Sequence, residues 1–272
     1  MDLSGLSVAV LKEMAKERSA VTADFLAALA GDQRKGAQEL FNRLNREQSA
    51  AAAETRRLER LFVYEDNVRA NGYSPIAGVD EAGRGPLAGP VFAAAVILPR
   101  DCLLQGLDDS KKLTPQKREH LAGRIKETAI AWSVAQATVE EIERHNIFRA
   151  ALMAMRRAVE HLTPVPAYVL ADGFRIDQLS IPQIPIIGGD RLSASIAAAS
   201  ILAKVERDAL MDKYHETYPM YGFIRHKGYG TAEHMTALAH YGPSPIHRRG
   251  FTPVRLVMSR NPLAPRKKGG PL

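Results

Sequence analysis

The sequence has little that would place the protein outside a cell or within a membrane. Its one cysteine, Cys102, cannot form an intramolecular disulfide, and without thiol partners it cannot anchor a cysteine-based zinc site. Long apolar runs are also missing, since the longest, such as residues 91–98, are far shorter than the roughly 20 residues that span a bilayer. The amino terminus lacks the basic region, apolar stretch and cleavage site of a secretory signal. We therefore expect a cytoplasmic protein with no membrane partner.

Negative charge is scarce toward the C-terminus. The net charge of the 272 residues is +7, and lysine plus arginine balance aspartate plus glutamate over residues 1–70 (11 against 11) and 71–203 (14 against 14). Over residues 204–272 they exceed them, 12 against 5. A one-sided basic segment suits a polyanion, because each phosphate neutralised by lysine or arginine releases counterions. The alternative is a solvated, flexible basic tail, which residues 261–272, with their proline and glycine, would form.

Proline is absent from residues 1–70, and this segment favours helices. Alanine, leucine, glutamate and arginine are abundant there, and apolar residues such as Leu40, Leu44 and Leu58 recur at helical spacing. The pattern predicts an N-terminal extension of two or three helices. Glycine, asparagine and proline then interrupt the chain at residues 71–75, where we expect a domain boundary.

Beyond this boundary the pattern changes to short apolar runs separated by helical segments. Thr114 and Pro115 are typical of a helix start, and further helical patterns cover residues 140–161 and the segment after residue 190. Strands that are first neighbours in sequence and later alternate with helices indicate an α/β fold with a mixed sheet flanked by helices. We expect one domain over residues 71–260, with a helical C-terminal part. Its predicted strands lie near residues 76–80, 91–98, 131–138, 168–172 and 184–187.

Four acidic residues lie where the predicted strands end. Asp80 and Glu81 follow the first strand, Asp172 ends another, and Asp190 follows the last. Taken singly, a surface acid pair, an Asp-Gly turn and a helix cap explain them. Together, four carboxylates would repel one another strongly unless cations were bound. Oxygen ligands of this kind favour Mg²⁺ or Mn²⁺, and the sequence leaves the choice between them open.

The two adjacent acids pose a geometric question. Consecutive strand residues point to opposite faces, so Asp80 and Glu81 can line one site only if the backbone departs from ideal extension near Glu81. Gly83 and Gly85, just beyond, make such a departure possible. Glycine-rich backbone also lets a sugar or phosphate approach main-chain N–H groups closely.

The sequence resembles the ribonuclease HII family, the type 2 branch of the ribonucleases H. The resemblance covers roughly residues 74–260, and residues 1–70 look like an extension that only some members carry. It implies a ribonuclease H-like fold and an endonuclease that leaves 5′-phosphate and 3′-hydroxyl ends by two-metal-ion hydrolysis. The matching stretches are DEAGRG at 80–85, AGP at 88–90, DSKKL at 109–113, ADG at 171–173, SASIAAASILAKVERD at 193–208 and GYGT at 228–231.

The resemblance also implies roles for particular residues. Gly83, Arg84 and Gly85 would recognise the ribose 2′-hydroxyl at an RNA-to-DNA junction, and Tyr229 would stack on the adjoining deoxyribose. The type 3 branch lacks arginine between the two glycines, so Arg84 favours type 2. The metal-binding, catalytic carboxylates would be Asp80, Glu81, Asp172 and Asp190.

The implied substrates are RNA/DNA hybrids and duplex DNA that contains single ribonucleotides, incised on the 5′ side of the ribonucleotide. This activity belongs to ribonucleotide excision during DNA replication and repair. We expect a monomer. One rival hypothesis is a DNA-cutting resolvase or integrase of the wider ribonuclease H architecture, and the GRG turn argues against it. The other is a hybrid-binding module without catalysis, and the four intact carboxylates argue against that.

Several further residues have both a functional and a structural interpretation. Lys111 and Lys204 can contact phosphate, although exposed lysines usually face solvent. The aromatic and basic residues of the segment 218–231 suit stacking and phosphate binding, although they also suit a packed connector. The histidine spacings match no familiar zinc ligand pair.

A stripe of small residues in the segment 193–208 predicts a helix that lies close to the sheet. We interpret its serines as helix-face or cap residues and not as nucleophiles: Ser193, Ser195 and Ser200.

Overall fold

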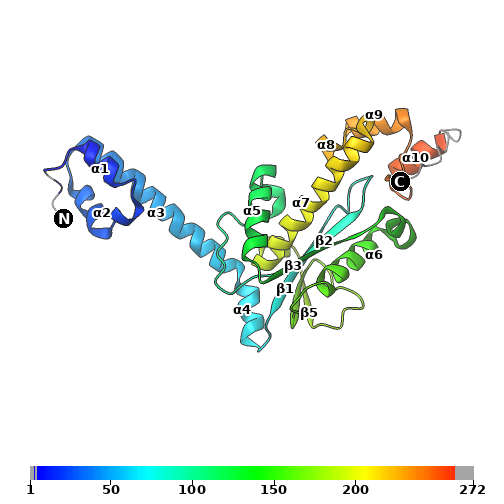
Figure 1. Ribbon diagram of the computed structural model, residues 1–272, viewed down its shortest axis with the longest axis horizontal. Helices are drawn as coiled ribbons and strands as arrows, with labels where there is room; N and C mark the ends of the chain where they lie inside the picture. The colour runs from blue at the N-terminus through cyan, green and yellow to red at the C-terminus, as the bar shows by residue number, and fades with distance from the viewer. Residues whose placement is uncertain (1–2, 4, 261–272) are drawn as a thin grey trace. The chain divides into compact units, whose positions relative to one another are not determined.

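The computed structural model describes residues 3 and 5–260, and the predicted basic tail at 261–272 lies outside these residues (Figure 1). Two compact units divide the chain between Arg57 and Leu58. Within the described residues, no helix has the length and apolar character needed to cross a membrane.

The first unit is helical. It contains α1 (Val8–Met14), α2 (Ala23–Gly31) and the first part of α3 (Lys35–Leu61). Ser7 and Thr22 cap the first two helices by accepting hydrogen bonds from backbone N–H groups in the first turn. The unit has its own small core, whose fully buried members include Leu11, Phe25 and Leu29.

The end of α3 and all of α4 (Val63–Ala70) belong to the second unit. Leu58 and Leu61 pack against the face of the sheet that α7 covers. Buried Glu65 accepts hydrogen bonds from the Ser193 hydroxyl at 2.7 Å and the Ser195 N–H at 2.9 Å. The division between compact units therefore lies before the predicted boundary at residues 71–75, because α4 is tied to the start of α7. Residues 1–70 include four described α-helices, and not the two or three predicted.

The predicted mixed sheet is confirmed, and its strands lie close to their expected positions. The order is β3-β2-β1-β4-β5, with β1–β2 and β2–β3 antiparallel and β1–β4 and β4–β5 parallel. Because β1 is central and β4 runs parallel to it, their C-terminal ends meet at one edge of the sheet. The strands are β1 (Ile76–Ala82), β2 (Val91–Ile97), β3 (Ala131–Ala137), β4 (Tyr168–Asp172) and β5 (Gln183–Ile186).

Helices cover both faces of the sheet (Figure 1). On one face lies α6 (Val139–Glu160), and on the other lie α5 (Pro115–Thr128) and α7 (Ala194–Thr217). The small residues of α7 allow close contact with β1: a Cβ added to Gly78 would come within 2.2 Å of the Ser195 carbonyl carbon. Ser193 caps α7 by accepting from the Ile196 N–H, and Ser195 and Ser200 are buried, as expected for cap and helix-face residues.

The helical C-terminal part continues from α7. It contains α8 (Phe223–His226), α9 (Ala232–Tyr241) and α10 (Thr252–Arg260). The connector between α8 and α9 lies against the chain that follows β1, since the Leu87 N–H donates to the Gly228 carbonyl at 2.8 Å. The same stretch pairs with the segment after α9 through a bridge between Ala88 and His247.

Candidate active site

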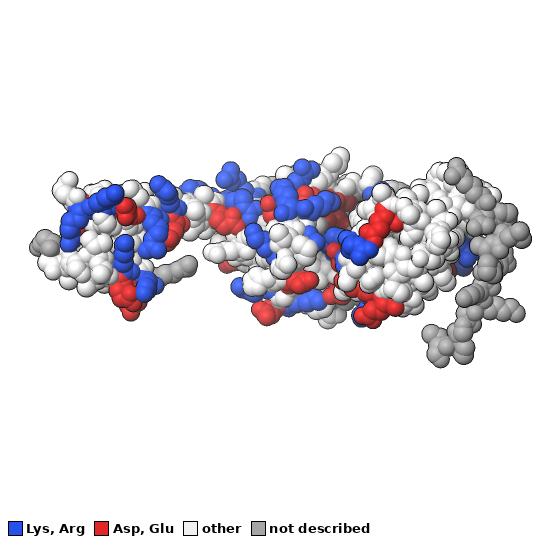
Figure 2. Space-filling model, turned by 90° about the horizontal axis from the view of Figure 1, so that it is seen from above, with Lys and Arg blue, Asp and Glu red and all other residues white. Residues whose placement is uncertain are grey.

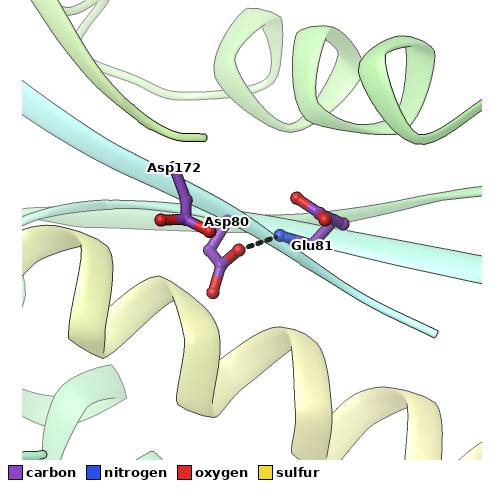
Figure 3. Close-up of side chains that lie close together, drawn as sticks. All are labelled: Asp80, Glu81 and Asp172. Carbon is purple, nitrogen blue, oxygen red and sulfur yellow. Dashed lines mark hydrogen bonds between the residues drawn. The ribbon is translucent and has the colours of Figure 1, made fainter. Parts of the chain in front are cut away.

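Three carboxylates meet at the shared edge of β1 and β4 (Figure 3). Asp80 and Glu81 lie near the end of β1, and Asp172 is the last residue of β4. One oxygen atom from each lies within 4.8 Å of the others. The convergence follows from the parallel pairing of the two strands, as the sequence pattern suggested.

A departure of the backbone from extension near Glu81 was the condition expected for both acids to line one site, and it does not occur at Glu81 itself. β1 stays paired with β2 through Ala82, with Glu81 opposite Ala93. Asp80 therefore points toward α7 and Glu81 toward the opposite side, as Figure 3 shows. One oxygen of each still lies within 4.8 Å of the other, and Asp80 Oδ1 accepts a hydrogen bond from the Glu81 N–H at 2.7 Å, which holds the Asp80 carboxylate toward Glu81. The change in backbone direction comes later, at Gly83, whose φ is +98°.

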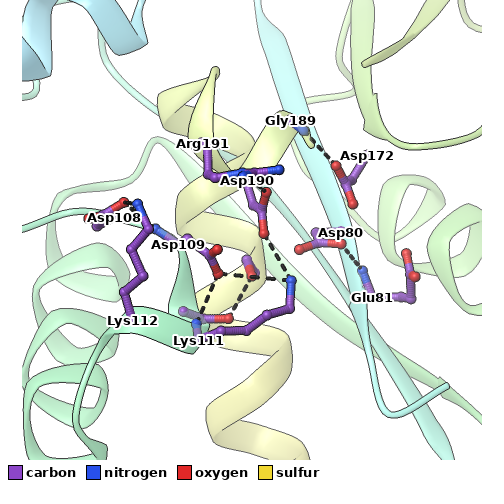
Figure 4. Close-up of polar contacts among 12 residues, drawn as sticks. Asp80, Glu81, Asp108, Asp109, Lys111, Lys112, Asp172, Gly189, Asp190 and Arg191 are labelled. Carbon is purple, nitrogen blue, oxygen red and sulfur yellow. Dashed lines mark hydrogen bonds and ion pairs between the residues drawn. The ribbon is translucent and has the colours of Figure 1, made fainter. Parts of the chain in front are cut away.

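Asp190 lies beside this cluster, just before α7 (Figure 4). Gly189 keeps the segment that carries Asp190 close to Asp172, because its N–H donates to Asp172 Oδ1 at 2.7 Å. A Cβ at this position would clash with the Ile196 side chain. Asp190 is 4% exposed, and its Oδ2 accepts a hydrogen bond from Lys111 Nζ at 3.1 Å. The fourth predicted acid is therefore next to the other three, with a lysine ammonium as its partner.

Burial and repulsion dominate the electrostatics of the cluster. Burial, followed by the charges of Glu81 and Asp172, raises the pKa of Asp80 well above its usual value. Burial likewise raises the pKa of Glu81, although Arg84 opposes the shift. The pKa of Asp172 is raised by burial and by Asp190, against the lowering effect of the Gly189 N–H. Cations bound among these oxygens would remove the repulsion.

The turn after β1 carries Gly83, Arg84 and Gly85 past the acids. Arg84 Nη1 lies 3.2 Å from Glu81 Oε1. At the other end of the turn, a Cβ added to Gly85 would lie 3.5 Å from the Tyr229 ring, so the residue faces that side chain directly. The turn thus contacts the carboxylate cluster at one end and Tyr229 at the other.

Two aromatic residues that the sequence interpretation missed lie beside Arg84. Its guanidinium lies 5.8 Å from the ring centre of Phe148 and 5.5 Å from that of Phe174. The rings form an edge-to-face pair with centres 5.0 Å apart. Phe174 follows Asp172 by two residues, and Phe148 follows a break in α6 at Asn146, where φ is 67°. Asparagine tolerates this conformation better than most residues, so its presence within a helical pattern is the local signal that could have marked the position.

Tyr229 borders a groove of about 750 Å³ between α5, α7 and α8. Tyr229 is 43% exposed, and Lys204 Nζ lies 5.9 Å from the centre of its ring. Lys204 also pairs with Asp208 at 2.7 Å. Other cations of this groove have acidic partners too, including Lys227 with Asp212. Figure 2 accordingly shows basic and acidic side chains interspersed on the face it presents.

Buried histidines support the backbone at Tyr229. His234 Nδ1 lies 2.9 Å from the Tyr229 carbonyl, and its Nε2 lies 3.0 Å from His247 Nε2. A carbonyl oxygen only accepts, so His234 carries its proton on Nδ1 and accepts from His247 at Nε2. Burial, as the main cause, lowers the pKa of both rings. The network is complete only when both imidazoles are neutral.

Comparison with solved structures identifies the architecture as that of ribonucleases H. A crystal structure of ribonuclease H2 from Pyrococcus horikoshii is 27% identical, with a TM-score of 0.59 over 68% of this chain and 97% of that chain. A ribonuclease HIII solved in complex with Mn²⁺ is 19% identical, with a TM-score of 0.57 over 68% of this chain and 69% of that chain, and shares the fold. The class that the sheet and its acids define is a nuclease of this type.

The chain belongs to the ribonuclease HII family, as the resemblance predicted. The family model for ribonuclease HII matches residues 77–254, and the model for the ribonuclease HII N-terminal domain matches residues 7–69. A ribonuclease HII from Pelotomaculum thermopropionicum is 58% identical over 95% of this chain and 98% of its own length. Another from Anaeromyxobacter is 51% identical over 96% and 84%. The protein is therefore an endonuclease with ribonuclease H activity on RNA/DNA, of a family that requires a divalent metal.

Proposed function

We propose that this enzyme cleaves the RNA strand of hybrids and incises duplex DNA on the 5′ side of a single embedded ribonucleotide, leaving 5′-phosphate and 3′-hydroxyl ends. The observation that carries the proposal is the position of the turn from Gly83 to Gly85, which contacts Glu81 at one end and Tyr229 at the other. Recognition of the ribose 2′-hydroxyl then takes place beside the acids. One ribonucleotide is enough, because the 2′-hydroxyl distinguishes RNA from DNA at a single position.

The four acids fit a site for Mn²⁺ or Mg²⁺. Oxygens of Asp80, Glu81 and Asp172 lie within 4.8 Å of one another, and burial together with the charges of the other two raises the pKa of Asp80, a repulsion that bound cations would relieve. Asp80, Glu81 and Asp172 would hold the ions, with Asp190 completing the set once Lys111 moves aside. When bound, two such ions supply activation of the attacking water and neutralisation of the leaving 3′-oxygen.

The remaining residues bind and orient the substrate. Arg84, which lies beside the rings of Phe148 and Phe174 and close to Glu81, is placed to bind a phosphate oxygen near the acids. Tyr229 offers an exposed ring on which the sugar of the next, deoxy nucleotide can pack. When the duplex binds, Lys111 would leave Asp190 and Lys204 would leave Asp208 to contact phosphate groups. Substrate binding would thus break two ion pairs.

We also propose that one chain, acting as a monomer in the cytoplasm, is sufficient, because all of these residues come from a single chain. The helical unit that ends at Arg57 would aid substrate engagement and not chemistry, since none of the acids lies within it.

Three duplexes of one sequence test the proposal, with one ribonucleotide, four ribonucleotides or none. At fixed salt and with Mn²⁺ or Mg²⁺, the first two should be cut and the all-DNA duplex should remain intact. Chelator should abolish cutting, and Asp80→Asn and Asp172→Asn should each lose most of it while retaining the fold. Efficient cutting of four ribonucleotides without cutting of one would contradict the role given to the turn.

A further inference from the structure

Two arginines lie fully buried beneath the turn that follows β1. Arg207, on α7, is 1% exposed, and Arg248, in the segment before α10, is 0% exposed. A Cβ added to Gly83 would come within 2.1 Å of Arg207 Nε, so the turn rests directly on this side chain. Arg207 also lies 5.9 Å from the ring centre of Tyr229.

Both guanidinium groups donate their hydrogen bonds to backbone carbonyl oxygens. Arg248 donates to Gly83 at 2.6 Å, to Arg84 at 2.9 Å, to Gly89 at 2.8 Å and to Pro90 at 3.2 Å. The partners of Arg207 are the carbonyls of Ala88, Pro90 and Lys227, at 3.1 to 3.2 Å. The two side chains thus hold most of the chain from residue 83 to residue 90 and join it to the connector that carries Tyr229.

A neutral side chain would satisfy such carbonyls at a lower cost. Neither guanidinium has a carboxylate within ion-pair distance in the part of the chain that the structure describes. Burial and, second, the charge of Arg207 lower the pKa of Arg248 to about 9. Two like charges buried without an acidic partner cost stability, so a requirement beyond packing has to account for them.

The geometry of the peptide bond supplies that requirement. In a planar trans peptide, the carbonyl oxygen and the N–H of the following residue point in opposite directions. Arg248 turns the carbonyls of Gly83 and Arg84 inward, so the N–H groups of Arg84 and Gly85 point outward. Neither N–H donates a hydrogen bond within the described residues, and Gly85 is exposed beside Tyr229.

We propose that Arg248, supported by Arg207, is a positioning residue that sets the ribonucleotide selectivity of the enzyme by orienting the Arg84 and Gly85 N–H groups toward the substrate. The fork of the guanidinium is essential, because one planar group has to hold several carbonyls at once. Asp208 acts on Arg207 electrostatically but forms its ion pairs with Arg118 and Lys204, so the phosphates of the bound duplex would add negative charge near the two buried cations. This inference rests on the proposed function, since it explains how that site selects a ribose.

The test compares Arg248→Gln and Arg248→Lys with wild type in two measurements. One is kcat/KM on a duplex with a single ribonucleotide, and the other is inhibition of that reaction by the all-DNA duplex of the same sequence. Arg248→Gln should lower kcat/KM by about tenfold or more while the inhibition constant of the DNA changes by less than about threefold. Arg248→Lys should resemble Arg248→Gln, because an ammonium keeps the charge but cannot bridge the carbonyls.

Arg157→Gln is the matched control. Arg157 also donates to a backbone carbonyl, that of Gln136, but it lies on α6 and pairs with Glu141 away from the turn. Arg157→Gln should lower the melting temperature without changing the ratio of kcat/KM on the single-ribonucleotide duplex to the inhibition constant of the all-DNA duplex. A purely structural role of Arg248 would weaken ribonucleotide cleavage and DNA binding together, and that result would overturn the proposal, as would wild-type kcat/KM in Arg248→Lys.

A second measurement needs no variant and therefore does not depend on whether Arg248→Gln folds. Amide hydrogen exchange at Arg84 and Gly85 in the wild-type protein should be fast alone and slow in the presence of the single-ribonucleotide duplex. The all-DNA duplex should protect them much less, and equal protection by both duplexes would refute the assignment. If wild type does not cut the single-ribonucleotide duplex, the proposed function itself fails, and with it the selectivity that Arg248 is said to set.

Discussion

The substitution Asp80→Asn should make the metal-free protein more stable while it removes most activity. Asp80 is 4% exposed, and this burial, together with the charges of Glu81 and Asp172, raises its pKa well above the usual 3.8. The unfolded chain ionises this group near pH 3.8, whereas the folded protein resists its ionisation. The resulting penalty is absent at lower pH, grows as the pH rises toward the folded pKa, and is complete above it.

The size of the effect follows from linkage. A carboxyl group whose pKa rises by one on folding loses about 1.4 kcal/mol of stability once it is ionised. Asparagine keeps the shape and the acceptor that bonds to the Glu81 N–H, but it carries no charge. In chelator at pH above the folded pKa of Asp80, we expect Asp80→Asn to gain at least about 1 kcal/mol, which is about 2–4 °C in melting temperature for a unit of this size.

With metal ions bound, wild type should be more stable than Asp80→Asn. Mn²⁺ at 100 times its dissociation constant stabilises a single-site protein by about 2.7 kcal/mol, and Asp80→Asn should gain much less because a ligand is missing. Cleavage should fall on the order of 100-fold or more. Asp177→Asn, which alters an exposed carboxylate between β4 and β5, is the control and should behave as wild type. A variant that melts at or below wild type in chelator, or that gains equal stability from Mn²⁺, would refute the reasoning.

Three other predictions follow from the same contacts. A chain that begins at Leu58 should keep wild-type single-turnover cleavage. A chain that begins at Gly72 should melt at a lower temperature than this one, because it lacks the buried Leu58 and Glu65. Equal melting temperatures of the two chains would contradict the division of the protein between Arg57 and Leu58. Tyr229→Ala should reduce the preference for an RNA-to-DNA junction, and Tyr229→Phe should retain it because the ring remains, so loss in both variants would exclude stacking as the cause. Burial lowers the pKa of His247 from 6.5 to about 3, so the unfolded chain binds a proton there that the folded protein does not, and stability should fall as the pH drops from 6.5 toward 3. The slope over this range should be flatter in His247→Gln, and an unchanged slope would show that another group is responsible.

The strands and the ends of several helices could be predicted because their signals are local. The apolar runs that form β2 and most of β4 are uninterrupted in the sequence, and Thr114 caps α5 by accepting a hydrogen bond from the Lys117 N–H, three residues away. The convergence of Asp80 with Asp172 also followed from strand ends, since parallel neighbours present their C-termini at one edge.

The rest depends on contacts between distant parts of the chain. Arg248 bonds to Gly83 across 165 positions, and Glu65 bonds to Ser193 across 128, so no local pattern could indicate either contact. The boundary predicted near residues 71–75 also depends on distant contacts. Glycine and proline there did mark the end of a helix. What they could not show is that this helix, α4, packs with the catalytic unit.

The most direct test of the account is to identify the ends produced from a duplex that contains one ribonucleotide. Mass analysis of the products in Mn²⁺ or Mg²⁺ should show an upstream DNA strand with a 3′-hydroxyl and a downstream strand that begins with the ribonucleotide and carries a 5′-phosphate. Cutting on the other side of the ribonucleotide, a cyclic phosphate end, or the same products in the presence of excess chelator would contradict metal-dependent hydrolysis at the carboxylates of Asp80, Glu81 and Asp172.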